Sequence, residues 1–448
     1  MDTKKLRQKI LDLAIRGKLV PQDPTDEPAS GLLQRIRAEK ERLIAEGKIK
    51  RPKKSKTPSS ESNYTNLPSG WEKTTLKDIA WFGGGKTPST ENKQFWKDGT
   101  VNWVTSKDMK EPIINHSQIK LSDIGAVQNT LYPKGSLLMV TRSGILRRTL
   151  PLAILGEAAT VNQDIKTICT PYTELNEYLY YYFSGREKEI LEKFQKDGTT
   201  VESIDFEKFQ EIEILLPPLQ EQIRIIHQLK YLFNVQSNID SETSELKRLI
   251  NDSKSKILEL AMQGKLVPQD PTDEPAAEML KRINPNAKIL TDSQHYPQLP
   301  SNWALIRLGE VVKVVNGKSQ KDVENQFGAY PIYGSGGIIG MADAYSCLAG
   351  STIIGRKGTI NNPLFIRVNF WNVDTAFGMK PNEALDDKFF YYFCRSFNFA
   401  SLDKSSTIPS LTKTAIENII LPIPPKREQQ SIVQKIEEYA MIMSRIMC

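Results

Sequence analysis

The sequence predicts an α+β fold in which two mixed, β-rich units are separated by long helical segments. Three observations in the 448-residue chain support this prediction. Residues 17–28 recur letter for letter at residues 264–275, which indicates an internal repeat. A region rich in β-branched and aromatic residues, broken by glycine, proline and asparagine, follows each copy. Residues 219–263 contain neither proline nor glycine and carry apolar residues at 4-3 spacing, a pattern typical of a coiled coil.

The chain begins with two predicted helices. Apolar residues at three- and four-residue spacing predict a helix over residues 3–16, which ends at Gly17. We expect Asp26 to cap a second helix that has Pro28 in its first turn. Residues 52–66 have the composition of a linker. The basic run at residues 48–56 is predicted either to contact DNA or to form a solvated tail, and the sequence leaves both interpretations open.

The remaining strands are predicted from runs of β-branched and aromatic residues, and the remaining helices from apolar residues at three- and four-residue spacing. Strands are expected at residues 101–104, 137–141 and 167–169, followed by helices that contain Tyr178 and residues 187–196. The long helix is predicted to pack through a seam of apolar residues: Ile225, Leu229, Leu232, Ile239, Leu246, Ile250, Ile257 and Leu260. We therefore divide the chain into an N-terminal helical region at 1–58, a first β-rich unit at 59–216, a central region with the spacer helix at 217–290, a second β-rich unit at 291–423 and a C-terminal helix at 424–448.

Alignment of the two halves extends the repeat well beyond the twelve identical residues. The matched motifs are Leu67, Pro68, Ser69 and Trp71 with Leu299, Pro300, Ser301 and Trp303; Gly85 and Lys86 with Gly317 and Lys318; Arg142, Ser143 and Gly144 with Arg356, Lys357 and Gly358; and Glu221 and Gln222 with Glu428 and Gln429. The two terminal helices together resemble the central helix. We therefore expect them to lie against it as an antiparallel spacer, which gives pseudo-twofold symmetry within one chain.

Composition excludes several classes of protein. The four cysteines are far apart, with no CxxC pair, and the three histidines are scattered, so neither a zinc site nor a disulfide framework is expected. This cysteine usage favours a reducing cytoplasm. No run of about 18 apolar residues predicts a membrane span. The formal net charge of +7 is compatible with a phosphate-binding face.

Catalytic motifs are absent from the sequence. The Gly85, Lys86, Thr87 triplet lacks the earlier glycine of a phosphate-binding loop, because Ala80 occupies that position. The glycines at 83–85 have no partner tetrapeptide of the kind found in adenine methyltransferases, and neither GxSxG nor HExxH occurs. We therefore predict no catalytic residue and no metal ligand in this chain.

Basic and small polar residues near glycines are the candidates for DNA contact. Glycine lets backbone approach a phosphate closely, and arginine is able to bond a guanine edge through two hydrogen bonds. The strongest candidates lie on two matching loops: Arg142, Ser143, Arg147 and Arg148 in the first, and Arg356, Lys357 and Thr359 in the second. The other candidates are Lys86, Thr87, Thr199, Thr200, Lys318, Ser319, Tyr333, Ser335, Ser405 and Ser406.

Over essentially its whole length the chain resembles the specificity (S) subunits of type I restriction–modification systems. The motifs that carry the resemblance are the two Gly-Lys-Leu-Val-Pro-Gln copies, the Leu-Pro-x-x-Trp openings, residues 333–336 and 354–358, and the proline-rich segments followed by Glu-Gln before each helix. The resemblance implies two target-recognition domains, each of which binds one half of a split, asymmetric site on double-stranded DNA.

The same resemblance implies partners and a division of labour. Two modification (M) subunits bind S-adenosylmethionine and methylate adenine N6, while restriction (R) subunits use ATP and Mg. The S subunit itself is then non-catalytic, binds no cofactor and has no contact with a membrane. Two other classes remain open on the residues alone. The first alternative is a self-contained DNA methyltransferase or nuclease with unrecognised motifs. The second is a coiled-coil scaffold that binds only proteins.

Overall fold

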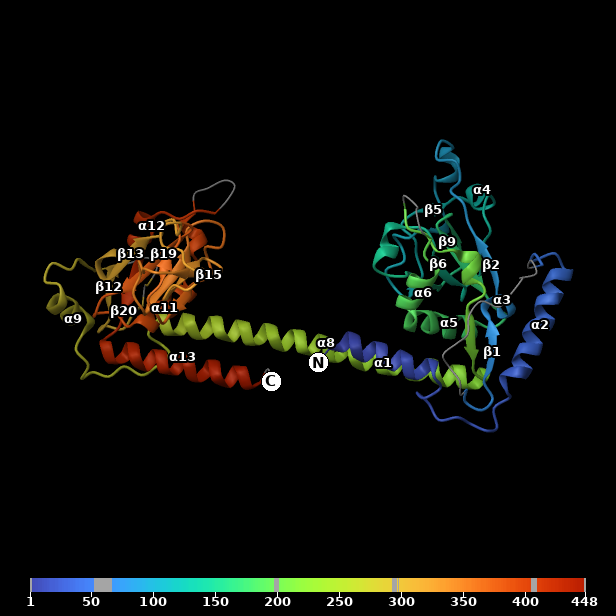
Figure 1. The fold of residues 1–448 in the computed structure, drawn as a ribbon, viewed down its shortest axis with the longest axis horizontal. Coiled ribbons are helices and arrows are strands. Elements are labelled where there is room, and N and C mark those ends of the chain that lie inside the picture. The colour runs from blue at the N-terminus through green and yellow to red at the C-terminus, as the bar shows by residue number, and fades with distance from the viewer. Residues whose placement is uncertain are drawn as a thin grey trace. The chain divides into compact units, whose positions relative to one another are not determined.

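The computed structural model describes residues 2–51, 67–196, 201–291, 296, 298–403 and 409–446. The linker predicted at residues 52–66 lies outside the described residues. The chain divides into two compact units, Met1–Ser241 and Glu242–Cys448, and helix α8 (Leu219–Met262) contributes to both. Both units combine helices with sheets (Figure 1), so the predicted α+β content is confirmed.

The described residues of the first unit form three sheets. A two-stranded sheet pairs β1 (Glu72–Thr75) with β10 (Glu213–Leu216). A five-stranded sheet has the order β2 (Trp81–Gly84), β9 (Ile165–Cys169), β6 (Leu137–Val140), β7 (Leu152–Leu155) and β4 (Ile113–Ile114). A three-stranded sheet has the order β5 (Lys120–Leu121), β3 (Val101–Val104) and β8 (Ala159–Val161). The three strands expected from the sequence correspond to β3, β6 and β9.

The second unit repeats this strand order. One sheet has the order β11 (Ile289–Leu290), β12 (Ala304–Arg307) and β20 (Ile420–Ile423). The next has the order β13 (Val312–Asn316), β19 (Ala376–Pro381), β16 (Ser351–Gly355) and β17 (Leu364–Ile366), which matches β2, β9, β6 and β7. The third has the order β15 (Gly337–Ala342), β14 (Tyr330–Gly334) and β18 (Trp371–Asn372). The parallel pairing of β14 with β18 matches that of β3 with β8.

Helices pack against the sheets in each unit. Those of the first unit are α1 (Thr3–Ile15), α2 (Ala29–Ala45), α3 (Leu76–Ile79), α4 (Asp123–Ala126), α5 (Thr173–Gly185), α6 (Glu187–Phe194) and α7 (Phe206–Phe209), with 3₁₀ turns η1 (Lys93–Phe95) and η2 (Gly144–Arg147). Those of the second are α9 (Ala276–Ile283), α10 (Leu308–Val311), α11 (Asp387–Ser396), α12 (Lys413–Glu417) and α13 (Lys426–Ile446), with η3 (Phe399–Leu402). Aromatic side chains of α5 and α11 fill the two main cores.

Helix α1 agrees with its predicted bounds, whereas the predicted cap of α2 is wrong. The residue that precedes α2 is Pro28, and no side chain caps this helix. Asp26 instead accepts hydrogen bonds from the guanidinium group of Arg224 on α8, with the shorter distance at 2.6 Å. A nearly buried carboxylate is stabilised more by an arginine than by a helix end that remains accessible to water.

A cluster that we call the first junction joins three of the repeated motifs. The Trp71 indole donates to Glu221 Oε2 at 2.9 Å, and the Gln22 amide lies 3.4 Å from Glu221 Oε1. Glu221 is only 1% exposed, and burial raises the pKa of its carboxyl group. Gly17 has φ +64°, and a Cβ atom there would lie 2.5 Å from Cγ of Pro68.

The second unit contains the same cluster, the second junction. The Trp303 indole donates to Glu428 Oε1 at 3.0 Å, and the Gln269 amide donates to the same oxygen at 2.7 Å. Gly264 has φ +68°, and a Cβ atom there would lie 2.4 Å from Cγ of Pro300. The twelve-residue repeat, the Leu-Pro-x-x-Trp opening and the Glu-Gln pair therefore recur together because they contact one another.

Substitution of Gly17 tests the close packing of the first junction. We expect Gly17→Ala to lower the free energy of unfolding by about 2 to 4 kcal/mol, since a strained positive φ and an overpacked contact both contribute. Gly47→Ala is the matched control because Gly47 has φ +68° but no atom within 4 Å of the added Cβ. Urea unfolding measures the free energy of unfolding of both variants. Equal destabilisation of the two would contradict the role of the Pro68 contact.

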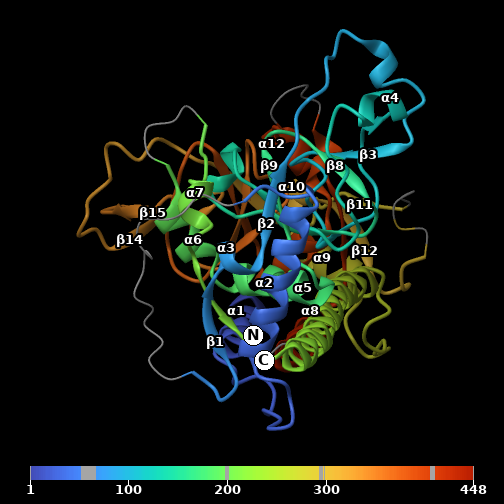
Figure 2. The same cartoon turned by 90° about the vertical axis from the view of Figure 1, so that its right-hand side faces the viewer.

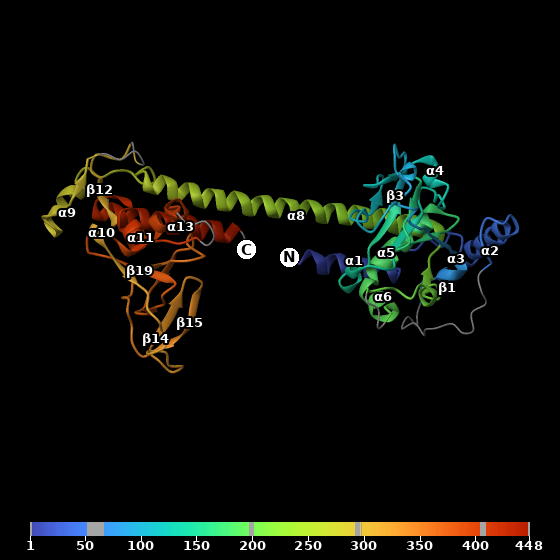
Figure 3. The same ribbon diagram turned by 90° about the horizontal axis from the view of Figure 1, so that it is seen from above.

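Helix α8 is a single continuous helix, as the sequence predicts. In the first unit α1 runs alongside it (Figures 1 and 3), the Gln236 amide donates to the Thr3 carbonyl and the Arg7 guanidinium lies 3.7 Å from the Phe233 ring centroid. In the second unit α13 runs alongside the C-terminal part of α8 and against α11 (Figures 1 and 3).

The predicted seam residues differ in burial. Three of them are buried (Ile225, Leu229 and Ile250), and three are half-buried (Leu232, Ile257 and Leu260). Ile239 and Leu246 are 39% and 40% exposed, respectively. In the first unit α1 begins at Thr3, which contacts Gln236, so Ile239 lies beyond the reach of α1.

Candidate nucleic-acid interface

The first candidate surface is a loop that follows β6, the first arginine loop (residues 142–148). Arg142 forms a β-bridge with Ser203, and the amide of Ser143 donates to the Glu202 carbonyl at 3.0 Å. The Ser143 hydroxyl accepts from the amide of Ile145 and caps η2. These contacts hold the loop backbone against residues 202–203 and leave its arginines at the surface.

The arginines of this loop are not equivalent. The Arg147 guanidinium donates to Glu202, and this hydrogen bond lowers the pKa of the Glu202 carboxyl. Arg142 and Arg148 are exposed, and no carboxylate among the described residues pairs with them. Since an unpaired arginine gives up no ion pair when it contacts a phosphate, Arg142 and Arg148 are better placed for that role.

The second arginine loop (residues 356–359) has the same backbone frame in the second unit. Lys357 forms a β-bridge with Ser410, and the amide of Gly358 donates to the Pro409 carbonyl at 3.0 Å. Arg356, Lys357 and Thr359 are all exposed. Gly358 has φ +74° with open space where a side chain would be, so a phosphate group is able to approach its backbone.

These bridges correct the alignment of the two loops by one residue. Arg142 occupies the position of Lys357, because each pairs with a matching serine, Ser203 or Ser410. Arg356 therefore corresponds to Thr141, which is buried. Long-range pairing defines this register, whereas the sequence alignment followed the shared arginine. The exposed Arg356 is thus specific to the second unit.

The Gly-Lys pairs have a structural explanation that the sequence alone did not provide. A Cβ atom at Gly85 would lie 1.6 Å from the Val161 carbonyl oxygen, and one at Gly317 would lie 1.7 Å from that of Val373. Close backbone contact therefore requires both glycines. Lys86 and Lys318 are exposed, and an indole donates to each lysine carbonyl at 3.3 Å: Trp103 in the first unit and Trp371 in the second.

The remaining candidates lie in different environments. The Thr87 hydroxyl donates to the Gln163 side chain at 2.7 Å, and Ser319 is exposed. Tyr333 is half-buried, with its ring 5.6 Å from that of Phe370, which is a packing role. Ser335 lies close to Gly355 and so brings the β14–β15 turn next to the second arginine loop. The other four candidates lie outside the described residues: Thr199, Thr200, Ser405 and Ser406.

One aromatic pocket in the first unit was missed at the sequence level. Trp96 and Trp103 pack edge to face with ring centroids 5.1 Å apart. They line a pocket of about 680 Å³ together with Lys93 and Lys97. The Trp96 indole donates to the Ser89 carbonyl at 3.0 Å, which orients the ring. The signal in the sequence is the pair of lysines that flank Trp96, since lysine beside an aromatic residue is common in nucleic-acid interfaces.

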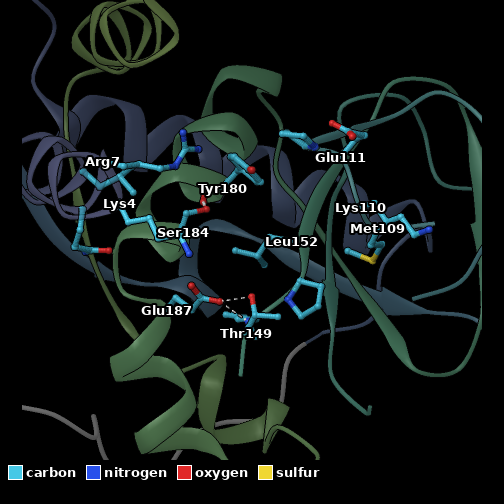
Figure 4. A pocket seen from close by; sticks show the side chains of 15 residues that line it. Lys4, Arg7, Met109, Lys110, Glu111, Thr149, Leu152, Tyr180, Ser184 and Glu187 are labelled. Carbon is cyan, nitrogen blue, oxygen red and sulfur yellow. Dashed lines mark hydrogen bonds between the residues drawn. The ribbon is translucent and has the colours of Figure 1, made fainter. Parts of the chain in front are cut away.

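Another pocket, of about 330 Å³, lies between α1 and the segments 109–112 and 149–152 (Figure 4). Lys4, Arg7, Tyr180 and Ser184 lie on one side of it, and residues 109–112 lie on the other. The Ser184 hydroxyl donates to the Tyr180 carbonyl within α5 at 2.7 Å. The Thr149 hydroxyl and the Leu150 amide both donate to Oε1 of Glu187, at 2.5 and 2.6 Å, so this carboxylate holds the backbone at residues 149–150 in place.

In the part of the chain that the structure describes, no group of three or more His, Cys, Asp or Glu side chains is placed to hold a metal ion. Burial raises the pKa of the thiols of Cys169, Cys347 and Cys394. Every described helix is too short or too polar to cross a lipid bilayer.

Comparison with known proteins identifies a family and its fold. The family model for the type I restriction modification DNA specificity domain matches residues 68–248 and 300–446. The chain is 28% identical over 381 residues to the type I restriction enzyme EcoAI specificity subunit of Escherichia coli, which covers 71% of this chain and 64% of that protein. It is 35% identical over 155 residues to the EcoR124I/EcoR124II specificity subunit of Escherichia coli, which covers 34% of this chain and 38% of that protein.

The chain thus spans less than two thirds of the length of these two curated relatives. A structural similarity extends further along the chain. A structure solved in work on the assembly and conformational transition of the type I R-M system superposes with a TM-score of 0.59. It is 17% identical and covers 86% of this chain and 93% of the solved chain, so this similarity concerns the fold alone.

Proposed function

Because the chain belongs to the type I restriction modification DNA specificity domain family, we propose that it is the non-catalytic DNA specificity subunit of such a system. One observation supports this function best. The same strand order occurs twice, and each copy presents an arginine loop at the same place with different exposed side chains. Two related folds with different contact residues suit a bipartite, asymmetric DNA site.

The two β-rich units, residues 59–216 and 291–423, are the proposed target-recognition domains. The helical regions at 1–58, 217–290 and 424–448 form the proposed spacer. In this proposal α1 and α13 pack on α8 as an antiparallel coiled coil with pseudo-twofold symmetry, and the seam from Ile225 to Leu260 holds it. The length of a stiff spacer then sets the gap between the two half-sites.

The proposed partners are double-stranded DNA, two M subunits and R subunits. S-adenosylmethionine, ATP and Mg belong to those partner subunits, and this chain contributes the position on DNA at which adenine N6 is methylated. A cytoplasmic location follows from that role. Transfer of a labelled methyl group from S-adenosylmethionine by the purified chain alone would overturn the non-catalytic assignment and favour a self-contained methyltransferase.

Substitutions in the second arginine loop test the DNA interface. In the complex with M subunits, we expect Lys357→Ala to weaken binding by about 1 kcal/mol on every duplex and to reduce the salt slope by about one, as loss of a phosphate contact does. We expect Arg356→Ala to lose about 1 to 3 kcal/mol only on the recognised sequence if this side chain bonds a base edge.

Fluorescence anisotropy over a series of salt concentrations measures both quantities. Lys413→Ala on α12 is the matched control, since it removes the same charge from a lysine of the same unit that pairs with Glu417. Affinity and salt slope that stay unchanged in both loop variants would remove the second arginine loop from the interface.

A further inference from the structure

A deep basic cleft of about 860 Å³ opens in the first unit, at the side of β2 where α2 ends. Helix α2 runs beside β2 and α3 there (Figures 1 and 2). Among the described residues, six cationic side chains line the cleft: Lys40, Lys48, Lys50, Arg51, Lys77 and Lys134. None of the described residues that line it is acidic. We call it the basic cleft. Lys48, Lys50 and Arg51 belong to the basic run at residues 48–56, for which the sequence left DNA contact open, whereas none of the individual residues predicted to contact DNA lines the cleft.

Three of the six cations have carboxylate partners that lie outside the lining. Lys48 pairs with Glu46 at 2.8 Å, Arg51 with Glu41 at 2.7 Å and Lys77 with Glu211 at 2.9 Å. The other three have no carboxylate partner among the described residues: Lys40, Lys50 and Lys134. The basic cleft therefore has an excess of positive charge, which attracts a polyanion.

Lys40 differs from the others because its ammonium group is buried. It donates to the carbonyl oxygens of Lys77 and Ala80 at 2.5 and 2.9 Å, at the end of α3. Burial lowers its pKa to about 8, so the group still carries its charge at neutral pH. Lys40 thus ties α2 to the edge of the sheet, while the exposed Lys50 and Lys134 remain available to a ligand.

At the floor of the cleft, strand β2 packs tightly against the side chain of Tyr132. A Cβ atom at Gly83 would lie 2.1 Å from the Tyr132 hydroxyl oxygen. That hydroxyl donates to the Gly84 carbonyl and accepts from its amide, both at 2.8 Å. The strand and the ring are therefore held together, and Lys134 follows Tyr132 by two residues. A rigid floor presents its charged rim with little loss of conformational entropy on binding.

The described residues that follow α9 in the second unit contain no counterpart to the basic segment that follows α2. Helix α9 has 8 residues and ends at Ile283, where Asn284 and Pro285 follow, whereas α2 has 17 residues and leads into Lys48, Lys50 and Arg51. A partner present in two equivalent copies would need the feature twice. A ligand that meets the two units differently, as an asymmetric DNA site does, needs it once.

We propose that the basic cleft binds backbone phosphates of duplex DNA that flank the half-site contacted by the first unit. This inference rests on the proposed function and deepens it. The lining shares no residue with the arginine loops, so these phosphate contacts add to those made at the half-site. Phosphate contacts carry no sequence information directly, but they supply affinity and position the protein on the duplex.

The test uses the full chain in complex with M subunits and the double substitution Lys50→Gln with Lys134→Gln. Duplexes that carry the recognised sequence are shortened from one end or from the other. We expect the double variant to bind the long duplex about tenfold more weakly, with a salt slope smaller by about two, as for two lost phosphate contacts. Shortening at one end should weaken the unsubstituted complex and leave the double variant unaffected.

The control is Lys188→Gln with Lys208→Gln, which removes the same charge from side chains that are 90% and 74% exposed on α6 and α7. Unchanged salt slope and unchanged dependence on duplex length in the cleft variant would overturn the inference. If Lys357→Ala still weakened binding, the proposed function would stand without it. Competition by ATP at micromolar concentration, lost in the cleft variant, would instead identify a free nucleotide as the occupant and also overturn it.

Discussion

Replacement of Trp303 by alanine is expected to lower the free energy of unfolding of the second unit by about 3 to 5 kcal/mol. The side chain is buried, and its indole donates to the buried carboxylate of Glu428. The substitution opens a cavity and also removes a hydrogen bond from a group that water does not reach, so both effects destabilise the fold. Urea unfolding combined with hydrogen exchange in β12 and β20 measures the loss in this unit.

Two further variants separate the cavity from the hydrogen bond. Trp303→Phe keeps most of the packing and loses the indole donor, so we expect a smaller loss of about 1 to 3 kcal/mol. Trp371→Ala is the matched control, because Trp371 is half-buried and its indole also donates one hydrogen bond, in this case to the Lys318 carbonyl. If Trp371→Ala destabilised the unit as much as Trp303→Ala, the second junction would have no special role.

Exchange of residues 59–216 for the corresponding unit of another family member is expected to change one half-site and leave the other intact. Binding to the original sequence should fall by about a thousandfold or more, the usual difference between specific and non-specific sites. Sequencing of DNA selected by the exchanged complex reports both half-sites. A change in both halves would contradict two independent recognition units.

The first junction constrains the design of this exchange. Trp71 lies inside the exchanged segment, but its partners Gln22 and Glu221 lie outside it. The donor unit must therefore carry the Leu-Pro-x-x-Trp opening. A second exchange in which that tryptophan is replaced by alanine serves as the control for misfolding, since it should lose stability without gaining a new half-site.

Local patterns in the sequence predicted the elements that local physics determines. The periodicity of α1 and α8 and the β-branched runs of β3, β6 and β9 were sufficient, because each depends on neighbouring residues. Asp26 failed as a helix cap because its partner, Arg224, lies 198 residues away. The contact candidates were found through the repeat, but their register depends on Ser203 and Ser410, which the sequence does not place beside the loops.

The junctions mark a further limit of prediction from sequence. All of their motifs were visible as repeats, yet nothing local indicates that Gln22, Trp71 and Glu221 meet. The basic cleft is similar, because the charge run after α2 was apparent while Lys134 and the glycine-rich strand β2 belong to a different part of the chain. Contacts of this kind require the tertiary structure.

The two junctions also determine how much of the chain must be synthesised before each unit is able to fold. The first unit buries Trp71 only after Glu221 has left the ribosome, and strand β1 waits for β10, its partner at residues 213–216. The second unit is complete only when α13 (Lys426–Ile446), which carries Glu428, has been synthesised. A nascent chain that stops before α13 therefore leaves Trp303 without its hydrogen-bond partner and the core without Ile432 and Ile436. Apolar surface exposed in this way is recognised by chaperones and proteases.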